Sequence, residues 1–474
     1  MLVRRVLAGA LAAGVVLLSA AAAQASRPLR TGIFDPAAFG TADPSLAFAR
    51  TKAAGASFVR LAFSWAGVAQ AQPASAVDAE NPGFAGYHWT GIDNQVEHAA
   101  AAGLTPVLDM LGAPSWAQPG GNKGTPVLPD VEQLGEFVKA VALHFGGSTP
   151  GVPRVRFFQL WNEPNLSTEL EPQTAAAAVW YRNALNAFAA SVHGVHSDNL
   201  VVAGGLAPFE ELPRPGVSTT GLGPIPFIRI ALCMSAGAVP RPTCKSGVDA
   251  DIWAFHPYTY GQPTDKAASP NELSAGDIPR AEALLRAAQK AGHLRSRGPL
   301  QFWVTEFSYD TNPPDSKAIP IALQARWTSE ALFEFWSDGI DLVTWFLLRD
   351  MPYPSTSFQS GLYFAGASLQ DDKPKPTLTA FRFPFVAVMD GGAYTLWGRT
   401  PDSKPAAVTI ELKSGPAWTK LLTLHADANG IFQTRWSTPL RRGFVRARLA
   451  GGNDVSLSYG LRPAPDLRVL PFGH

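Results

Sequence analysis

The stretch Val155-Arg156-Phe157-Phe158-Gln159-Leu160-Trp161-Asn162-Glu163-Pro164-Asn165 decides the fold of this chain. It begins as an apolar, aromatic-rich run with the composition of a β-strand, and it ends abruptly in Asn-Glu-Pro. Because proline lacks a backbone N–H group and restricts the residue before it, the strand should end near Glu163. An amide and a carboxyl group are therefore expected side by side at the C-terminal end of a strand.

Strand-like and helix-like segments alternate outward from this stretch. Strands are expected at Thr31–Phe34, Phe58–Phe63, Thr105–Met110, Val155–Asn162, Leu200–Gly204, Ile252–Phe255, Phe302–Glu306 and Leu342–Phe346. Amphipathic helical patterns lie between them, for example in Ala175–Val192 and in Ile321–Ser337. Eight such units predict an α/β fold in which a parallel sheet closes as a (β/α)8 TIM barrel. A doubly wound open sheet is the rival, but eight strands with acids at strand ends favour the barrel.

The pattern changes after about Val388 to short runs with the alternation of β-strands, such as Val408/Ile410/Leu412. Asp427-Ala428-Asn429-Gly430 is typical of a hairpin turn. We therefore expect the barrel over residues 27–388, a small antiparallel β-sandwich over 391–462 and a tail over 463–474. The β-sandwich carries no acid cluster, so we favour a role in covering a barrel face over glycan binding.

The first 25 residues have the features of a signal peptide. Two arginines precede an apolar run, and Ala23-Gln24-Ala25 fits the pattern for cleavage before Ser26. An uncleaved anchor helix is the alternative, but the run is short for a bilayer span. We therefore expect a secreted protein that does not stay inserted in a membrane.

The chain has only two cysteines, Cys233 and Cys244. Export to an oxidising compartment predicts that they form one disulfide that closes a short loop. The charge balance of 39 basic against 38 acidic residues gives no basic excess to hold phosphate groups. We therefore expect no nucleic-acid partner, and we expect a monomer.

Chemically active side chains gather where the predicted strands end. Reactive groups of a parallel barrel lie at the C-terminal ends of its strands. These ends carry Arg60, the turn Gly112-Ala113-Pro114-Ser115-Trp116, Asn162 with Glu163, His256-Pro257-Tyr258, Glu306 and Trp345. Such a set is costly to desolvate unless its members bind one another or a substrate. Core packing explains it poorly.

Two acids at two strand ends, Glu163 and Glu306, have the chemistry for cleaving an acetal. One carboxyl group protonates the leaving oxygen, and the other stabilises or attacks the oxocarbenium-like carbon, without a cofactor. The first acid must stay protonated near neutral pH, which requires a pKa raised by burial or by the other charge. A separation of about 5–5.5 Å between the carboxyl groups predicts a retaining reaction.

Trp161-Asn162-Glu163-Pro164 at one strand end and Thr305-Glu306-Phe307 at another resemble the clan A glycoside hydrolases. These are the cellulase-like families, including families 5 and 39, and the resemblance covers roughly Leu29 to Val388. It implies a retaining β-glycosidase with a carbohydrate substrate and no cofactor. The third strand lacks the histidine of many family 5 enzymes, and its Pro114-Ser115-Trp116 turn is similar to the Pro-x-Trp of family 39.

The resemblance also implies a role for each matching residue. Glu163 is the expected acid/base, Glu306 the nucleophile, and Asn162 the partner of the sugar 2-hydroxyl. His256 and Tyr258 are expected to line the site, Tyr258 and Arg60 to hold Glu306, and Trp345 to form the floor under the sugar. Apart from the resemblance, Trp65, Trp116 and Tyr260 are candidate sugar-stacking platforms outside the cleavage point.

Several of these residues have a purely structural alternative. Asn162 could cap the following helix, His256 could be a core histidine, and Arg60 could pair with Asp35 or Asp109. The pair His193-x-x-His196 has the spacing of metal ligands, but it follows a helix end without nearby acids or cysteines, so we expect no metal site. A non-catalytic glycan-binding barrel and a transglycosylase are the alternative functions.

Overall fold

The computed structural model describes residues 26–122, 124–210, 221–356, 358–440, 442–463, 465 and 467. The predicted signal peptide and most of the predicted tail lie outside the described residues. Within the described residues, no helix is long and apolar enough to cross a membrane.

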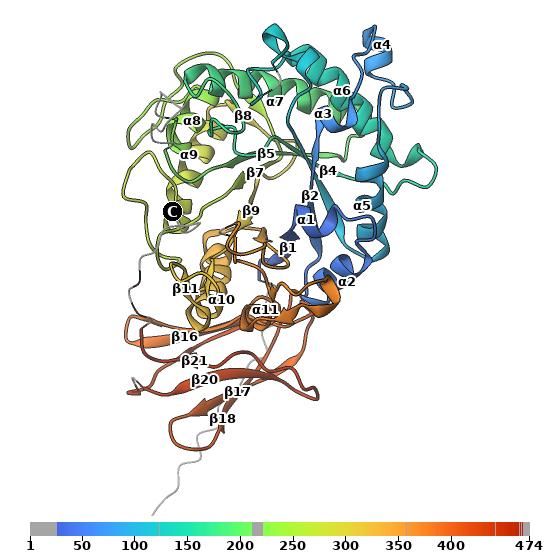
Figure 1. Cartoon of the computed structure of the whole chain (residues 1–474). Coiled ribbons are helices and arrows are strands. Elements are labelled where there is room, and N and C mark those ends of the chain that lie inside the picture. The colour runs from blue at the N-terminus through green and yellow to red at the C-terminus, as the bar shows by residue number, and fades with distance from the viewer. Residues whose placement is uncertain are drawn as a thin grey trace, which may run out of the picture.

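Eight parallel strands close into a barrel, which confirms the predicted fold class (Figure 1). The strands are β1 (Arg30–Phe34), β2 (Phe58–Ser64), β3 (Thr105–Leu111), β4 (Phe157–Leu160), β5 (Leu200–Leu206), β7 (Ile252–Phe255), β9 (Gln301–Phe307) and β12 (Leu342–Phe346). Neighbours pair in chain order, and β1 closes the ring by pairing with β12 in parallel register from Arg30↔Leu342 to Phe34↔Phe346. Each of these strands overlaps one of the eight segments predicted from the sequence.

Helices surround the barrel (Figure 1). They are α1 (Pro36–Phe39), α2 (Ser45–Ala53), α3 (Trp65–Val68), α4 (Ala76–Ala79), α5 (Thr90–Ala101), α6 (Val131–Leu143), α7 (Ala175–Val195), α8 (Pro224–Ala231), α9 (Ile278–Lys290), α10 (Ile321–Asp338) and α11 (Pro376–Arg382). Local chemistry sets their ends. The side chain of Asp130 accepts a hydrogen bond from the Gln133 N–H at the start of α6, and Gly339, with a φ of 102°, ends α10.

Short two-stranded sheets lie outside the barrel. They pair β6 (Val248–Asp249) with β8 (Leu294–Arg295), β10 (Thr311–Asn312) with β11 (Ile319–Pro320), and β13 (Tyr363–Phe364) with β14 (Lys373–Pro374). The predicted disulfide between Cys233 and Cys244 is present in the segment between α8 and β6.

An apolar layer fills the inside of the barrel toward the N-terminal ends of its strands. It is formed by Phe58, Val107, Val202, Ile252, Ala254, Trp303 and Leu342, with Phe157 and Leu200 packed against it. Gly32 makes room for this layer on β1, because a Cβ atom there would lie 3.2 Å from the Cβ of Phe58 and 3.2 Å from Oγ1 of Thr344. Side chains therefore fill the barrel at the N-terminal ends of the strands, and a reaction site can form only at the C-terminal ends.

Two antiparallel sheets follow the barrel in the chain and lie against one side of it, as Figure 1 shows in orange and red. One sheet has the order β15 (Phe385–Asp390), β16 (Ala393–Arg399) and β19 (Ile431–Trp436), and the other has the order β18 (Thr419–His425), β17 (Ala407–Lys413), β20 (Phe444–Leu449) and β21 (Tyr459–Gly460). The first strand begins at Phe385, upstream of the predicted segment 391–462. Together the two sheets form the small β-sandwich that the sequence predicted after the barrel.

Candidate active site

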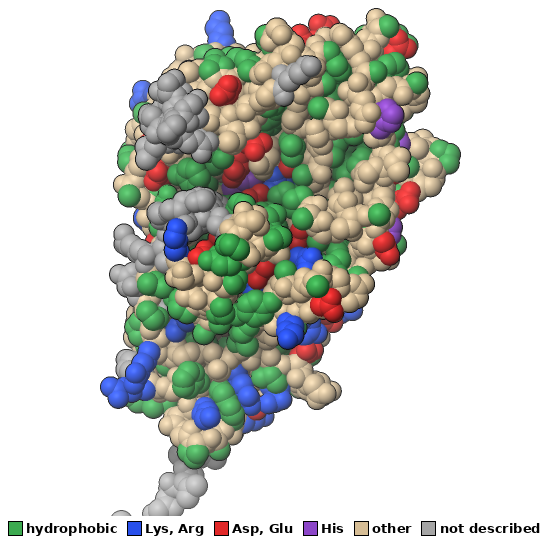
Figure 2. Space-filling model, in the orientation of Figure 1, with side chains coloured by type: hydrophobic (Ala, Val, Ile, Leu, Met, Phe, Trp, Pro, Cys, Tyr) green, Lys and Arg blue, Asp and Glu red, His purple; other side chains and the backbone are tan. Residues whose placement is uncertain are grey.

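A polar layer lies directly above the apolar layer of the barrel. Side chains of a strand alternate between its two faces, so the residue two positions after each apolar interior residue also points inward. These residues are Arg60, Asp109, Gln159, His256, Thr305 and Thr344, all of them buried. Figure 2 shows a hollow over the barrel where acidic, basic and histidine side chains gather. The strand alternation therefore builds the base of the site.

Glu306, near the end of β9, is held by two donors. The Tyr258 hydroxyl donates to Oε1 at 2.8 Å, and Nη1 of Arg60 donates to Oε2 at 2.8 Å. Both donors fix the orientation of the Glu306 carboxyl group. The structure thus brings Tyr258 and Arg60 into contact with Glu306, and their roles toward it stay predictions.

Arg60 contacts several polar residues at the C-terminal end of the barrel, which is called the mouth below. Its Nη2 donates to Oδ2 of Asp109 at 2.6 Å and to Oδ1 of Asn162 at 2.7 Å. Asp35, the other acid considered as its partner, instead accepts from the backbone of Ala38 and of Leu348. Arg60 thus forms the structural ion pair with Asp109 and contacts Glu306 at the same time.

Glu163 follows β4 on a backbone with unusual torsion angles. The φ values of Trp161 and Glu163 are 65° and 39°, a region that non-glycine residues enter at a cost of about 1–3 kcal/mol. The fold holds this backbone through two hydrogen bonds, from Trp161 N–H to the Met110 carbonyl and from Glu163 N–H to the Gly205 carbonyl. The strained turn brings the Glu163 side chain over the barrel.

The surroundings of Glu163 favour its neutral form. Burial raises its pKa to about 7, although the charge of Arg60 lowers it. Its Oε1 lies 3.0 Å from Nδ1 of His256, whose Nε2 lies 3.1 Å from Oγ1 of Thr305. Burial lowers the pKa of His256 to about 3, so this imidazole is neutral near pH 7. Glu163 is therefore placed to carry a proton near neutral pH.

The two glutamates lie opposite one another across the mouth. A carboxylate oxygen of Glu163, a ring nitrogen of His256 and a carboxylate oxygen of Glu306 all lie within 4.8 Å of one another. These three ligand atoms also have a spacing that a metal ion could use. The guanidinium of Arg60 already supplies a positive charge to Glu306, and it would repel a second cation there.

Phe346 and Phe34, paired in register across β12 and β1, provide an aromatic surface in the mouth. Their ring centroids are 5.7 Å apart, and Phe358 packs edge-on against Phe346 at 5.4 Å. The guanidinium of Arg60 lies 4.3 Å from the centroid of the Phe34 ring. These contacts place the two rings beside the groups that hold Glu306.

Trp345 does not lie on this surface, which corrects the prediction that it forms the floor under the sugar. Its side chain is 1 % exposed, and its Nε1 donates to the Ser360 carbonyl at 2.9 Å. Its ring packs against Phe307 and against Phe381 of α11, on the helical side of the sheet. Strand alternation could have shown this, because Phe346 shares the inward parity of Leu342 and Thr344.

The predicted platform Trp65 is also a core residue. It is fully buried, stacks on Phe137 with a centroid distance of 5.5 Å, and meets Trp116 edge-on at 5.7 Å. No face of its ring is free for a sugar, so the prediction for Trp65 is corrected. Trp116 is partly exposed and lines a hollow beside α4 and α6.

The pair His193 and His196 has separate structural partners. Nε2 of His193 lies 2.8 Å from Oδ2 of Asp251, and Nε2 of His196 lies 3.0 Å from the Gly146 carbonyl. An acid therefore lies near His193, which the sequence did not predict. Among the described residues, the cluster with metal-ligand spacing is the one formed by Glu163, His256 and Glu306.

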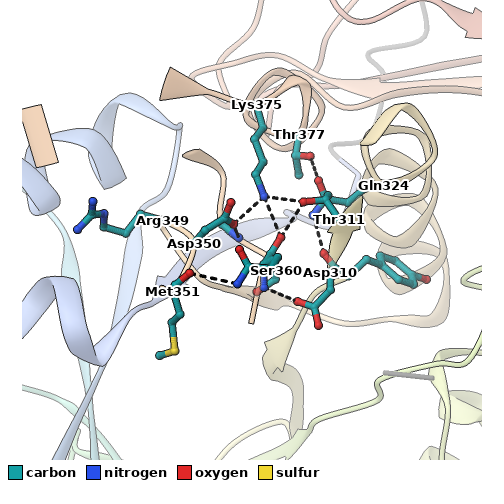
Figure 3. A network of polar contacts seen from close by, with 12 residues as sticks. Asp310, Thr311, Gln324, Arg349, Asp350, Met351, Ser360, Lys375 and Thr377 are labelled. Atoms are coloured by element: carbon teal, nitrogen blue, oxygen red, sulfur yellow. Dashed lines mark hydrogen bonds and ion pairs between the residues drawn. The ribbon is translucent and has the colours of Figure 1, made fainter. Parts of the chain in front are cut away.

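A buried lysine ties together the loops that follow β9 and β12 (Figure 3). Nζ of Lys375 donates to Oδ1 of Asp350 at 2.6 Å, to Oγ1 of Thr311 at 2.8 Å and to the Gln359 carbonyl at 2.8 Å. The Gln359 N–H also donates to Oδ1 of Asp310 at 2.8 Å. Since Phe358 precedes Gln359, this network supports the aromatic surface of the mouth.

A further acid, Glu169, lies on the loop after Glu163 and was missed by sequence reasoning. Burial raises its pKa to about 7, with smaller contributions in the same direction from the charges of Glu163, Asp109 and Glu306. It follows no strand directly, so no alternation pattern could have singled it out.

The two facing carboxyl groups at the C-terminal ends of β4 and β9 are the pair of acids that glycoside hydrolysis uses. The family model of cellulase (glycosyl hydrolase family 5) matches residues 37–313, which is more than half of the chain. The chain therefore belongs to the cellulase family of glycosyl hydrolases and is a glycoside hydrolase. Comparison with curated protein sequences finds no match.

Solved structures share the fold. A family 39 glycoside hydrolase from the gut symbiont Bacteroides cellulosilyticus WH2 superposes with a TM-score of 0.54 and 19% identity, covering 87% of this chain and 79% of that one. A monomeric beta-xylosidase from Caulobacter crescentus CB15 gives a TM-score of 0.50 and 16% identity, covering 88% of this chain and 98% of that one. At these identities the similarity shows the barrel architecture alone.

Proposed function

We propose that this glycoside hydrolase is a retaining β-glycosidase in which Glu163 is the acid/base and Glu306 the nucleophile. The observation that carries the proposal is the close approach of the two side chains, with one oxygen of each and a His256 nitrogen within 4.8 Å. An inverting enzyme needs about 6.5–9.5 Å between its carboxyl groups to admit a water molecule. The nearest oxygens of the two groups lie closer than this range, which supports direct attack by a carboxylate.

The reaction proceeds in two displacements. Glu306 attacks the anomeric carbon while Glu163 gives its proton to the departing oxygen, which leaves a glycosyl ester on Glu306. Glu163, now ionised, removes a proton from a water molecule that attacks the same carbon and releases Glu306. Both steps use only these two side chains and water.

The neighbouring residues prepare the two acids for these roles. Arg60 and Tyr258 donate to Glu306 and orient it for attack. Because Oδ1 of Asn162 accepts from Arg60, the Asn162 amide group is left to donate to a sugar hydroxyl. Phe346 and Phe34 offer the apolar surface on which a sugar ring can lie. The role of Trp116 as an outer platform stays a prediction.

The proposal is tested by removing one acid at a time. Glu306→Ala should lower kcat on an aryl β-glycoside by more than about 10³-fold, and added azide should restore part of the turnover by replacing the missing nucleophile. Glu163→Gln should lose activity chiefly on substrates with poor leaving groups. Hydrolysis at near wild-type rates by both variants would contradict the assignment.

We also propose that the protein is exported. The disulfide between Cys233 and Cys244 supports this, since such bonds persist in oxidising compartments. Mass spectrometry of protein recovered outside the producing cell should find Ser26 as the first residue. Recovery of the intact N-terminus in the cytoplasmic fraction alone would contradict export.

A further inference from the structure

The guanidinium group of Arg60 divides its hydrogen bonds between two sides of the mouth. One terminal nitrogen, Nη1, donates to Oε2 of Glu306 at 2.8 Å. The other, Nη2, donates to Oδ2 of Asp109 at 2.6 Å and to Oδ1 of Asn162 at 2.7 Å. Because each terminal nitrogen carries two hydrogens in a rigid planar fork, these two bonds use both hydrogens of Nη2. Asp109 and Asn162 therefore share one nitrogen, and the bond to one fixes the direction of the bond to the other.

Asp109 acts on the site through Arg60 and not through the substrate. It lies on β3, in register with Ala62 of β2 and Gln159 of β4, and its side chain is fully buried. Its Oδ2 accepts from Arg60, whereas its Oδ1 is buried without a hydrogen-bond partner among the described residues. A sugar bound in the mouth cannot reach a side chain that is closed off in this way.

Asp109 is a poor choice of residue if the ion pair serves stability alone. Arg60 already has Glu306 as a counter-ion, so Asp109 adds a second buried carboxyl group to a single guanidinium. Burial raises the pKa of Asp109 to about 6, although Arg60 lowers it. Buried ion pairs can often be replaced by apolar side chains without loss of stability. The charge of Asp109 and its bond to Nη2 therefore point to a role in the site.

That role concerns the side-chain amide of Asn162. The two ends of this amide have nearly the same shape, but one accepts hydrogen bonds and the other donates them. Because Nη2 of Arg60 donates to Oδ1, the NH2 end is directed away from Arg60 and is left for a ligand. Without Asp109, we expect the guanidinium to turn and bind Glu306 through both terminal nitrogens, the pairing that arginine and carboxylate favour. The amide of Asn162 would then lose the bond that orients it.

We propose that Asp109 is a positioning residue that acts through Arg60 to keep the NH2 group of Asn162 directed at the 2-hydroxyl of the bound sugar. The inference rests on the proposed function, in which this amide donates to that hydroxyl. It adds a buried carboxyl group that touches neither the substrate nor the reacting atoms. Recognition of the 2-hydroxyl therefore depends on three residues in a row, of which only Asn162 contacts the sugar.

The experiment measures how strongly the reaction depends on the 2-hydroxyl. The probes are 4-nitrophenyl β-D-glucoside and 4-nitrophenyl β-D-xyloside, each compared with its 2-deoxy counterpart and assayed with the full chain. The 2-hydroxyl ratio is kcat/KM for the normal glycoside divided by kcat/KM for the 2-deoxy glycoside. Asp109→Leu should lower this ratio about tenfold, the size of one hydrogen bond that strengthens in the transition state. Asp109→Asn keeps an acceptor without the charge and should lower the ratio about threefold.

A double-mutant cycle shows whether Asp109 acts through Asn162. Asn162→Ala removes the amide and should itself lower the 2-hydroxyl ratio by at least the factor found for Asp109→Leu. Adding Asp109→Leu to Asn162→Ala should then leave the ratio where it is, because the positioned group is already gone. Losses that multiply in the double variant, or an unchanged ratio in Asn162→Ala, overturn the inference.

Asp251→Asn is the matched control for Asp109→Asn. Asp251 is another buried acid, and it lies at the N-terminal end of β7, where its Oδ2 accepts from the Val201 N–H at 2.9 Å and lies 2.8 Å from Nε2 of His193. Asp251→Asn should lower Tm without changing the 2-hydroxyl ratio. An equal loss on normal and 2-deoxy glycosides with Asp109→Leu would show a merely structural role and overturn the inference. If Asp109→Leu does not fold, an unchanged ratio in Asp109→Asn overturns it.

Failure of this inference is distinct from failure of the proposed function. If the 2-hydroxyl ratio of the Asp109 variants stays at the wild-type value while Glu306→Ala is inactive without azide, only the role of Asp109 is wrong. Hydrolysis of the normal glycoside by Glu306→Ala without azide would instead contradict the proposed function.

Discussion

Glu163 and Glu306 have the same side chain but opposite surroundings. Glu306 receives donated hydrogen bonds from Tyr258 and Arg60, which stabilise a negative charge. Glu163 is buried beside a neutral imidazole, and burial disfavours its charged form. In the proposed reaction Glu163 carries the proton and Glu306 attacks, which is the division of roles that glycoside hydrolysis needs.

This division predicts the pH dependence of the reaction. Burial raises the pKa of Glu163 to about 7, and only the protonated form is an acid. The protonated form of Glu163 therefore predominates below pH 7 and declines above it. As a result, kcat/KM should fall about tenfold per pH unit on the alkaline side. The measurement is a pH profile on a substrate with a poor leaving group.

Glu163→Gln supplies the control for this profile. On a dinitrophenyl glycoside, whose leaving group needs no proton, the variant should show no alkaline limb near pH 7. An alkaline limb at the wild-type position in Glu163→Gln would assign that ionisation to another group.

The aromatic surface gives a second prediction. Phe346→Leu keeps the apolar volume but removes the flat ring, so KM should rise about three- to tenfold, the size of one aromatic contact, with little change in Tm. Trp345→Phe should leave KM unchanged and lower Tm, because it removes the hydrogen bond to Ser360. A rise in KM with Trp345→Phe alone would contradict this placement.

The sequence predicted the mouth residues to different degrees. Glu163, Glu306, Arg60, His256 and Tyr258 all converge in the structure, because each ends a strand and a barrel brings strand ends together. Trp345 was chosen for its side-chain chemistry, against the alternation that points Phe346 inward.

At the scale of elements, the strands were predictable and the loops were not. The eight strands have apolar runs bounded by turn residues, which is a local signal. The strand β4 is shorter than predicted, since it ends at Leu160, before the left-handed backbone of Trp161. The network around Lys375 joins residues from three separate segments, and no periodicity marks such a contact (Figure 3).

The Lys375 network gives a prediction about stability. Lys375 is 2 % exposed, and its ammonium group neutralises the buried Asp350. Lys375→Met leaves that carboxylate without its cation and should cost about 3–5 kcal/mol of unfolding free energy, measured by urea denaturation. Adding Asp350→Asn to this variant should recover part of the loss.

Lys373→Met is the matched control, because Lys373 is exposed two residues away. It removes the same charge and should change the unfolding free energy by less than about 0.5 kcal/mol. Equal losses for Lys375→Met and Lys373→Met would show that the buried network does not hold the two loops.

At the scale of the whole molecule, the β-sandwich and the barrel share an apolar interface. Trp397 of β16 packs against Phe333 and Trp336 of α10 at centroid distances of 5.4 and 5.5 Å. The buried Arg399 donates to the Leu29 carbonyl at 3.0 Å and to the Phe381 carbonyl at 3.2 Å. The sandwich therefore completes the core around α10.

This interface predicts that the two parts unfold together. Differential scanning calorimetry of the wild-type protein should show one transition. Trp397→Ala opens a cavity in the shared core, so the variant should also unfold in one transition, at a lower Tm. Two resolved transitions, with only the β-sandwich affected by Trp397→Ala, would show that the parts are independent.

The most direct test of the central claim traps the glycosyl ester. The probe is a 2-deoxy-2-fluoro glycoside with a good leaving group. The fluorine slows both displacements, whereas the good leaving group speeds only the first. The ester therefore accumulates and can be located by peptide mass spectrometry. The account predicts one sugar per chain, attached to Glu306, and no label in Glu306→Ala. A label on another acid, or hydrolysis of a normal substrate with inverted anomeric configuration by nuclear magnetic resonance, would contradict it.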